Sequence, residues 1–483
     1  MSLKRGKVLF IIHDNYQDDN IFPMGPAYLA AILKQVGVEV SVYCMDIFHY
    51  TNQELADYLD DNEFDLIGLG FMAARFKRTV EELCGVIKRH KKKAWFVLGG
   101  HGPTPIEEYI LLATRADIVT LGEADDTILE LLNCKIEGGE KFKNIKGIAY
   151  RIGDVVTTNE RRNPVMNLDS LPFPAWNLFP MEKYTTSLKF SGTGENEKAF
   201  SVLTTRGCVN RCSFCYRMEK GIRTRSPQNI VDEVKALHDN YGIQYIYFSD
   251  ELSVTSKKQI AEFAALLHKN NLSIKYRMEC RVDLFDEEIA KILKDSGCVF
   301  LNIGFESTDQ NVLDILKKNV TVEQNIRAAE IANQLGIGIG LNFIWGLPGD
   351  SEKSLRNNAE FIKKYNHYDQ IRTIRPVTPY PGTPLYYEAI ERGLLGGPED
   401  FFSRFKNADL YMINFLDIPE KEIYEMLFEV NKDLILDHYS HTDNNLKEAN
   451  ILIEKFYNLY FKGETSFDGP RHYKTIDSVS KEE

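Results

Sequence analysis

Short apolar runs alternate with helical segments in two separate stretches of this chain, and this alternation constrains its fold more than any other feature. In residues 1–135 the apolar runs are continuous, which predicts strands buried on both faces. Strands of that kind separated by helices form a parallel sheet covered by helices on both sides. The first stretch is therefore predicted to be a doubly wound parallel sheet, with strands at 8–12, 38–43, 65–70, 94–98 and 118–121.

The second stretch, residues 196–395, repeats the strand–helix alternation with longer helices. Six strands are predicted, enough for a partial (β/α)6 barrel, in which the active site lies at the carboxyl ends of the strands. Residues 136–195 are predicted to be a linker with a hairpin, and residues 396–483 a helical C-terminal domain with a loose polar end from about Ser466. The predicted barrel strands are 200–204, 245–248, 275–279, 300–303, 338–345 and 371–377.

Length and composition agree with this organisation. A chain of 483 residues exceeds the usual size of one hydrophobic core and predicts two or three domains. The net charge of −12 argues against a general nucleic-acid binder. We find no export signal and no apolar run long enough to span a bilayer, so we expect a soluble, cytoplasmic protein. In a reducing compartment, clustered cysteines indicate metal or redox chemistry rather than disulfides.

Three of the eight cysteines, Cys208, Cys212 and Cys215, follow the first predicted barrel strand with the spacing C-x3-C-x2-C. Three thiolates on one loop leave one iron of a [4Fe–4S] cluster without a protein ligand, and that position can accept a substrate or cofactor. Structural zinc needs a fourth ligand, and none follows at a suitable spacing. The alternative is a chance group of buried cysteines. The remaining five, which show no second motif, are interpreted as packing residues: Cys44, Cys84, Cys134, Cys280 and Cys298.

With this motif the sequence resembles the radical S-adenosylmethionine (SAM) superfamily, over about residues 5–390. Phe214 fits the aromatic residue that precedes the third cysteine in the family. The segments at 304–307, 346–349 and 379–384 resemble motifs of a large branch that carries an N-terminal cobalamin-binding-type domain, which is Rossmann-like. The resemblance implies that the cluster chelates SAM at its open iron. One electron, from a donor such as flavodoxin or ferredoxin, then cleaves SAM to methionine and a 5′-deoxyadenosyl radical. That radical abstracts hydrogen from an unactivated carbon of a small-molecule substrate.

The resemblance also implies SAM contacts at the ends of successive barrel strands. The family's glycine-glycine-glutamate pattern is absent, which leaves open which carboxylate meets the SAM amine. Arg281 is a candidate for the SAM carboxylate, but it has Asp283 as an alternative partner. Glu306 has the alternative of capping a helix with Ser307. The implied SAM-binding residues are Phe214, Asp250, Glu251, Arg281, Glu306, Asn342 and Gly346.

A cobalamin site is implied at the carboxyl ends of the first domain's strands, where open α/β sheets bind ligands. The implied cobalamin-binding residues are Met24, Gly25, Gly70, Phe71, Gly99, Gly100, His101, Gly122 and Glu123. Residues 68–73 also fit a dinucleotide fingerprint, but no acidic residue ends the following strand.

Cobalt coordination stays open at this point. The Asp-x-His-x-x-Gly motif of classical cobalamin domains is absent, and His13, His49 and His101 lack its context. The alternative to a cobalamin site is a domain that kept the fold and lost the cofactor.

Three functions follow from these features. The first is a cobalamin-dependent radical SAM C-methyltransferase that acts on an unactivated carbon. The second is a radical SAM cyclase, dehydratase or carbon–carbon bond-forming enzyme, with or without cobalamin. The third is a non-catalytic iron–sulfur electron carrier or redox sensor, which the open ligand count and the barrel disfavour because carriers usually ligate their cluster fully.

Overall fold

The computed structural model describes most of the chain, which divides into two compact units. The described residues are 6–15, 21–138, 142–187, 190–194, 196–442 and 445–463. Unit 1 comprises residues 1–209, 216–279 and 292–299, and unit 2 comprises 210–215, 280–291 and 300–483. The loose end predicted from Ser466 lies outside the described residues.

The N-terminal part of unit 1 is the predicted doubly wound sheet. Its strand order is β2-β1-β3-β4-β5, followed by two further strands, and the first five strands are parallel. The strands are β1 (Lys7–Ile12), β2 (Glu39–Cys44), β3 (Leu66–Gly70), β4 (Trp95–Gly99) and β5 (Ile118–Thr120). The order reverses between β1 and β3, and such a switch point opens a crevice at the carboxyl ends of the strands.

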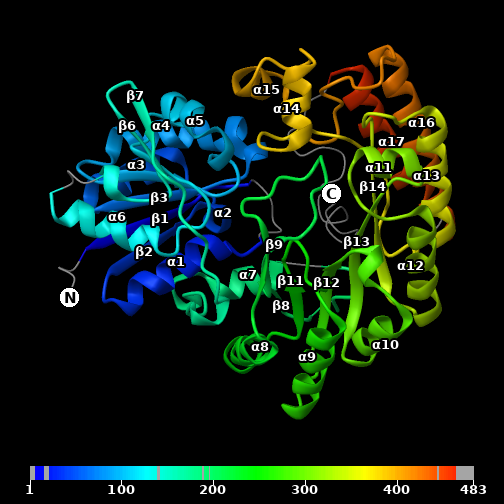
Figure 1. Cartoon of the computed structure of the whole chain (residues 1–483), viewed down its shortest axis with the longest axis horizontal. Helices are drawn as coiled ribbons and strands as arrows, with labels where there is room; N and C mark the ends of the chain where they lie inside the picture. Colours follow the sequence, from blue (N-terminus) through cyan, green and yellow to red (C-terminus); the bar gives the residue numbers. More distant parts are fainter. Residues whose placement is uncertain are drawn as a thin grey trace. The chain divides into compact units, whose positions relative to one another are not determined.

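Helices cover both faces of this sheet (Figure 1). On one face, α1 (Met24–Gln35) and α6 (Thr127–Ile136) bury apolar residues against the strands. On the other face lie α3 (Asn52–Asp61), α4 (Glu81–His90) and α5 (Glu107–Thr114). The apolar strands have no polar face to turn to solvent, so both faces need a helical layer.

The predicted hairpin forms and joins the sheet. It consists of β6 (Ile148–Ile152) and β7 (Val155–Thr158), and β6 pairs antiparallel with β5, with Ile118 opposite Tyr150. Ile148, Ala149 and Tyr150 are buried, so β6 shares the core of the domain. The sheet therefore extends to Thr158, beyond the position at which the sequence predicts a linker to begin.

The predicted six-stranded barrel sheet is also present. Its strand order is β8-β11-β12-β13-β14-β15, so the strands lie side by side in the order of the sequence. The strands are β8 (Ala199–Val202), β11 (Tyr245–Phe248), β12 (Lys275–Cys280), β13 (Cys298–Glu306), β14 (Gly338–Trp345) and β15 (Arg375–Pro376). The sixth strand is shorter than predicted: only Arg375 and Pro376 pair with β14, so it begins four residues later than expected.

In unit 1, α8 (Pro227–Tyr241) follows β10 (Gly221–Thr224), and α9 (Lys257–Lys269) follows β11. Each begins at a serine whose side chain accepts a hydrogen bond from the backbone three residues on, which satisfies one of the unpaired N–H groups of the first turn. Helix α8 ends at Gly242, which has a left-handed conformation.

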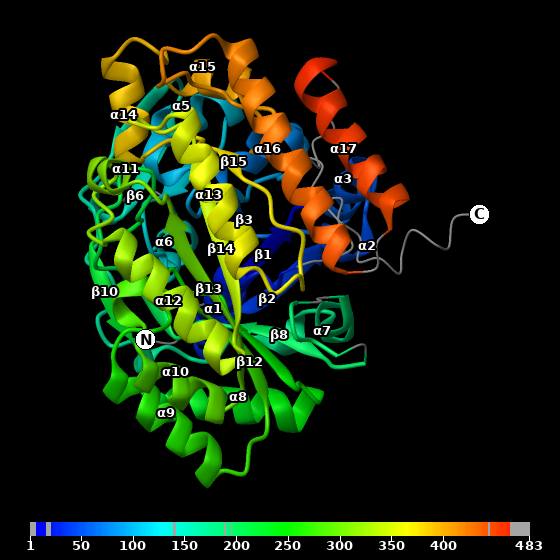
Figure 2. The same ribbon diagram turned by 90° about the vertical axis from the view of Figure 1, so that its right-hand side faces the viewer.

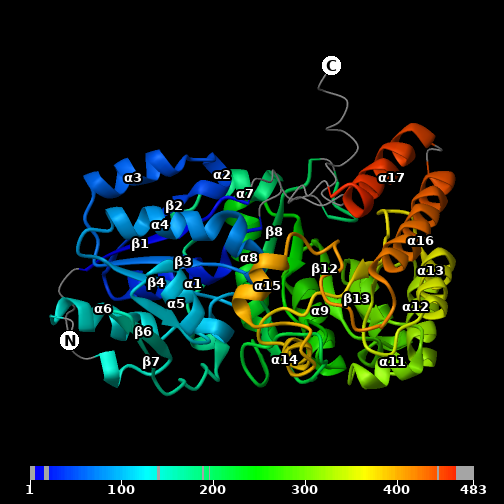
Figure 3. The same ribbon diagram turned by 90° about the horizontal axis from the view of Figure 1, so that it is seen from above.

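In unit 2, α12 (Val322–Leu335), α13 (Glu352–Tyr365) and α16 (Glu420–His441) lie side by side (Figure 2). Helix α16 also packs against α17 (Leu446–Phe461), as Figure 3 shows. Ile423, Leu427, Val430 and Leu434 recur at helical spacing along α16 and are buried, so they form its packing face. No helix in the described part of the chain is long and apolar enough to cross a membrane.

One buried carboxyl in unit 1 makes stability depend on pH. Burial raises the pKa of Asp46 to about 7, and the Tyr184 hydroxyl donates a hydrogen bond of 2.8 Å to its Oδ2. Folding therefore favours the neutral carboxyl, so its contribution to the free energy of unfolding is full below pH about 4 and is lost as the pH rises through about 7.

We expect Asp46→Asn to remove this pH dependence, because the amide keeps an acceptor for Tyr184 and does not ionise. Urea unfolding of the wild type should show a free energy of unfolding lower by about 2–3 kcal/mol at pH 8 than at pH 5 from this group alone. The difference between the two pH values should be smaller by that amount in the variant. An equal pH dependence in both proteins would contradict this interpretation.

Candidate functional site

A cavity of about 390 Å³ lies in unit 1 at the carboxyl ends of β3, β4 and β5. This is the edge of the sheet at which the sequence predicts a cobalamin site, and the volume is within the usual range for a ligand pocket, roughly 300–1,000 Å³. Seven of the nine predicted cobalamin-binding residues line it: Gly25, Gly70, Gly99, Gly100, His101, Gly122 and Glu123. The other two, Met24 and Phe71, are buried and do not belong to its wall.

Part of the cavity wall is apolar and comes from the sheet and from the helices α1 and α6. Phe10 and Val97 contribute from the strands, and Leu29 and Ile128 from the helices. Such a wall favours an apolar part of a ligand, which gains free energy by leaving water.

Glycines allow the backbone to line the cavity closely. A Cβ atom on Gly99 would lie 2.6 Å from Thr120 Oγ1, closer than any real side chain permits. Gly122 has a φ of +85°, and a Cβ atom there would lie 2.2 Å from Glu219 Oε1. Both positions therefore need glycine.

Two arginines and two carboxylates form the polar side of the cavity. The arginines come from the hairpin of β9 (Thr205–Cys208) and β10 (Gly221–Thr224), where Arg206 lies directly opposite Arg223. Arg206 donates to both carboxylate oxygens of Asp125, at 2.7 and 3.2 Å. Arg223 donates to both oxygens of Glu123, at 2.8 and 2.5 Å. Sequence reasoning missed Arg206, Arg223 and Asp125 because each partner lies 80 residues or more away along the chain.

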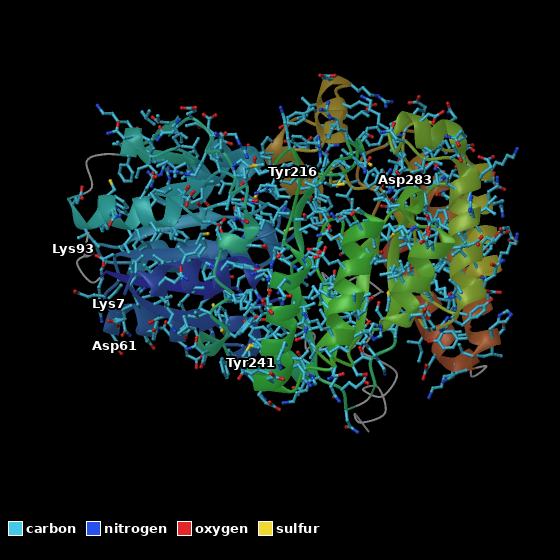
Figure 4. The ribbon with its side chains drawn as sticks, turned by 60° about the horizontal axis from the view of Figure 1, so that its bottom comes forward. Lys7, Asp61, Lys93, Tyr216, Tyr241 and Asp283 are labelled. Atoms are coloured by element: carbon cyan, nitrogen blue, oxygen red, sulfur yellow. The ribbon has the colours of Figure 1, made fainter. Side chains whose placement is uncertain are left out.

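His101 lies in the cavity wall with a half-exposed side chain. Its Nε2 is 3.9 Å from Glu251 Oε1, and its ring meets the edge of the Tyr216 ring at 5.8 Å between centroids (Tyr216 is labelled in Figure 4). His13 and His49 do not line the cavity. Burial lowers the pKa of His13 to about 4, and His49 lies 2.8 Å from the Asp14 carboxylate.

The two acidic residues after β11 have different environments, although both line the cavity. Asp250 is buried and accepts hydrogen bonds from the backbone N–H groups of Thr204 and Thr205, at 2.7 and 3.0 Å, and from the Thr204 hydroxyl. Burial raises the pKa of Asp250. The Glu251 side chain is partly exposed, with 31% of its surface accessible to solvent. Asp250 thus holds the turn between β8 and β9, while Glu251 is accessible to a ligand.

The predicted SAM residues of unit 2 include a cluster around a lysine that sequence reasoning missed. Lys318 Nζ lies 2.8 Å from Glu306 Oε1 and 6.0 Å from the centre of the Phe214 ring. The Lys318 carbonyl accepts a hydrogen bond of 2.8 Å from Arg281. The structure therefore brings Phe214, Arg281 and Glu306 together at Lys318, a residue that belongs to no motif.

Some partners in unit 2 agree with the alternatives that the sequence left open. Arg281 pairs with Asp283 (labelled in Figure 4) at 2.9 Å, as the sequence allowed. The alternative for Glu306 is not what the structure shows: Glu306 has a φ of +63° and pairs with Lys318, while Asp309 caps the helix that follows, α11 (Gln310–Ile315).

The two remaining SAM candidates on β14 and after it also have protein partners. Asn342 donates to Asn302 at 2.8 Å. Gly346 has a φ of +89°, and its carbonyl accepts a hydrogen bond from the Tyr411 hydroxyl at 3.3 Å.

The three predicted cluster ligands differ in exposure. Cys208 ends β9 and is half-buried, Cys212 is buried and Cys215 is exposed. In unit 2 the backbone of Ser213 fixes the loop, since its N–H donates to Leu316 and its carbonyl accepts from Leu385, both at 2.9 Å. Thiolates suit an iron–sulfur cluster. Among the described residues, no three His, Cys, Asp or Glu side chains are already gathered around one point, so the ligand assignment rests on donor chemistry and spacing. The other five cysteines are buried, as expected for packing residues.

Comparison with known proteins agrees with both halves of this picture. Residues 202–362 match the model of the radical SAM superfamily, and residues 18–132 match that of the B12 binding domain. The chain is 29% identical to an uncharacterized methyltransferase of Pyrococcus horikoshii, over 77% of this chain and 79% of the relative. It is 25% identical to the anaerobic magnesium-protoporphyrin IX monomethyl ester cyclase of Rubrivivax gelatinosus, over 79% and 70%.

A solved structure has the same fold. It is that of the cobalamin-dependent S-adenosylmethionine radical enzyme OxsB with aqua-cobalamin and SAM bound. The TM-score is 0.71 at 16% identity, and the match covers 94% of this chain and 73% of that one.

A B12 binding domain joined to a radical SAM barrel defines the class of this protein, an enzyme that uses SAM as a radical source. The chain belongs to the radical SAM superfamily, among the members that carry a cobalamin-binding domain. The cofactors expected from the sequence, a [4Fe–4S] cluster, SAM and cobalamin, are those of this class.

Proposed function

We propose that this protein is a cobalamin-dependent radical SAM methyltransferase that transfers a methyl group to an unactivated carbon of a small molecule. The observation that carries the proposal is the glycine-lined cavity at the carboxyl edge of the sheet, whose wall also contains Arg206 and Gly207, directly before Cys208. The similarity to a methyltransferase over more than three quarters of the chain supports the methyl-transfer outcome. A flavodoxin or ferredoxin of the cytoplasm is the proposed electron donor.

The cavity residues would hold cobalamin through shape and backbone contacts. Gly99, Gly100 and Gly122 would present the backbone to the cofactor, while the apolar wall with Phe10 and Ile128 would contact an apolar part of it and exclude water. His101, at the cavity wall, would contact the cofactor or the solvent beside it. When bound, the cluster supplies the electron that cleaves SAM, and cobalamin carries the methyl group.

Other residues would bind SAM and the cluster. Cys208, Cys212 and Cys215 are the proposed cluster ligands. Glu251 is the proposed partner of the SAM amine, because the Asp250 carboxylate already accepts three hydrogen bonds from Thr204 and Thr205.

The side chains around Lys318 are proposed to bind the rest of SAM. Arg281 carries a guanidinium suited to a carboxylate, and Asp283 holds its orientation from one side. Phe214, Glu306, Asn342 and Gly346 complete the proposed SAM contacts.

Glu251→Gln should weaken SAM binding about tenfold, since one charge-assisted hydrogen bond is worth roughly 1.5–3 kcal/mol. Stability should change little because the side chain is partly exposed. The comparison is Asp250→Ala, which leaves two buried N–H groups without acceptors and should lower stability by about 2–4 kcal/mol. Equilibrium dialysis with SAM and urea unfolding give the two readouts. A normal SAM affinity in Glu251→Gln would reject this carboxylate.

The methyl-transfer outcome is tested with SAM labelled in its methyl group. The cobalamin-loaded, cluster-loaded protein is incubated with reductant, and the label on protein-bound cobalamin is measured together with S-adenosylhomocysteine. We expect equal amounts of both. Formation of 5′-deoxyadenosine without any label on cobalamin would reject methyl transfer and keep the radical SAM class.

A second candidate function is a radical SAM cyclase, which the similarity to the protoporphyrin ester cyclase favours. A cyclase makes no use of the SAM methyl group, so the same labelling experiment separates the two.

A further inference from the structure

We propose that the ion pairs between the β9–β10 hairpin and the β5–α6 loop couple cobalamin binding to the loading of the iron–sulfur cluster. The inference rests on the proposed cofactors, and it assigns Glu123, Arg206 and Arg223 as positioning residues. The β5–α6 loop is residues 121–126, and it contains Gly122, which lines the cavity. All of these residues belong to unit 1.

The hairpin carries the first proposed cluster ligand in a fixed position. Cys208 is the last residue of β9 and pairs with Gly221 of β10. The strands approach so closely at Gly207 that a Cβ atom there would lie 2.4 Å from the Gly221 carbonyl oxygen. Arg206 is two residues before Cys208, so any shift of the Arg206 backbone moves the cysteine as well.

The loop is joined to the hairpin by a buried group of four charges. The Glu123 carboxylate accepts hydrogen bonds from both terminal nitrogens of Arg223 and lies 3.3 Å from Arg206. The Asp125 carboxylate pairs with Arg206. The four side chains are only 5–18% exposed. Separating them would leave buried charges without partners, which costs about 3–5 kcal/mol. The loop and the hairpin must therefore move together.

The positions of these charges favour a positioning role for Glu123 over direct contact with the cofactor. Both of its carboxylate oxygens are engaged by Arg223. Arg223 is further fixed by the Val165 carbonyl, at 2.8 Å, and Arg206 lies over the Tyr28 ring of α1 at 5.4 Å.

A second contact joins the same elements nearer the surface. Arg161 donates to Glu219 at 2.9 Å and to the Met218 carbonyl at 3.1 Å. Glu219 in turn lies against Gly122. Met218 and Glu219 lie just before β10 in the sequence, so this contact holds the start of that strand.

Cobalamin in the cavity would order the β5–α6 loop, and the cluster would order the cysteine segment. The ion pairs hold both elements in one arrangement. The first cofactor to bind therefore orders part of the structure that the second would otherwise have to order, so the second loses less conformational entropy on binding. Linkage requires the effect to be reciprocal, and coupling of this kind typically changes affinity by about 5–150-fold.

The test measures the Kd of hydroxocobalamin for the full-length protein with the cluster reconstituted and after its removal by a chelator. We expect cobalamin to bind the wild type about tenfold more tightly with the cluster than without it. In Glu123→Gln the ratio should fall below about twofold. If Glu123 had a purely structural role, Glu123→Gln would weaken cobalamin binding by the same factor with and without the cluster, and the ratio would not change.

Asp117→Asn is the matched control. Asp117 precedes β5, at the opposite end of the same strand, and pairs with Lys91 at 2.7 Å. Asp117→Asn removes a charge and keeps the shape of the side chain, so the tenfold ratio of cobalamin affinities should not change. Arg161→Gln serves if Glu123→Gln does not fold, since Arg161 is half-exposed, and it should lower the ratio to about threefold.

A wild-type ratio near one, or a wild-type ratio retained in either variant, would overturn the coupling. Failure of the proposed function would give a different result: the wild type would then bind no cobalamin, with or without the cluster. If it binds cobalamin and forms 5′-deoxyadenosine but shows a ratio of one, only the coupling is rejected.

Discussion

Replacing Cys212 with alanine should abolish both the iron–sulfur absorbance and the formation of 5′-deoxyadenosine. Three thiolates already leave one iron of the cluster without a protein ligand, and two thiolates cannot hold the cluster. The loss of 5′-deoxyadenosine formation should therefore exceed about 100-fold. Iron and acid-labile sulfide per chain, the absorbance near the cluster band and 5′-deoxyadenosine by chromatography are the measurements, made under anaerobic conditions.

Cys134→Ala is the matched control for this experiment. Cys134 is a buried packing residue of α6, so its loss should remove a little stability and no iron. Unchanged iron in Cys212→Ala, or equal loss of iron in both variants, would refute the assignment of the cluster ligands.

The second large effect is expected at Gly122. Alanine there would be strained at a φ of +85°, and its Cβ would collide with Glu219 at 2.2 Å and lie 3.1 Å from Arg161. The β5–α6 loop would have to withdraw from its place at the cavity. We therefore expect Gly122→Ala to bind cobalamin at least about tenfold more weakly, which corresponds to the loss of roughly 1.4 kcal/mol. Titration with hydroxocobalamin measures the change.

Gly153→Ala separates backbone strain from the effect on the cavity. Gly153 has a φ of +62° in the turn between β6 and β7, with nothing within 4 Å of an added Cβ. It should lose about 1–2 kcal/mol of stability, as an L-residue does in this conformation, and keep its cobalamin affinity. Equal affinities in the Gly122 and Gly153 variants would contradict the role given to the loop.

The periodicity of the sequence predicts the fold well because burial on both faces dictates it. Most strands of the first sheet are continuous apolar runs, while the edge strand β2 alternates polar and apolar residues, and the structure places all five in one parallel sheet. Two local features escape this reasoning. The pairing of Ile118 with Tyr150 joins strands that lie apart in the sequence, and β15 begins only at Arg375, after most of the predicted strand.

The candidate site is predictable where its residues follow strands or form a motif. Gly70, Gly99 and Gly122 each lie at the end of a strand or in the loop after it, so their convergence in one cavity follows from the topology. The charged partners have no such signal. Arg223 finds Glu123 only through folding, and no spacing in the sequence distinguishes either residue from an ordinary surface charge.

A similar reason explains Lys318 and Asp250. Lys318 reaches Glu306 across a loop that no motif marks, so its place beside Phe214 depends on tertiary structure. Asp250 lies where the sequence expects a SAM ligand, yet its hydrogen bonds go to Thr204 and Thr205. Strand position thus identifies which residues lie near the site, and hydrogen bonding separates those that bind a ligand from those that support the backbone.

The central claim is that this chain binds cobalamin and generates a 5′-deoxyadenosyl radical from SAM. It is tested most directly by incubating the anaerobically reconstituted protein, loaded with cluster and hydroxocobalamin, with SAM and a low-potential reductant. We expect one tightly bound cobalamin per chain and 5′-deoxyadenosine that forms only when the cluster is present. A cluster-loaded protein that retains no cobalamin, or that forms no 5′-deoxyadenosine from SAM, would contradict the claim.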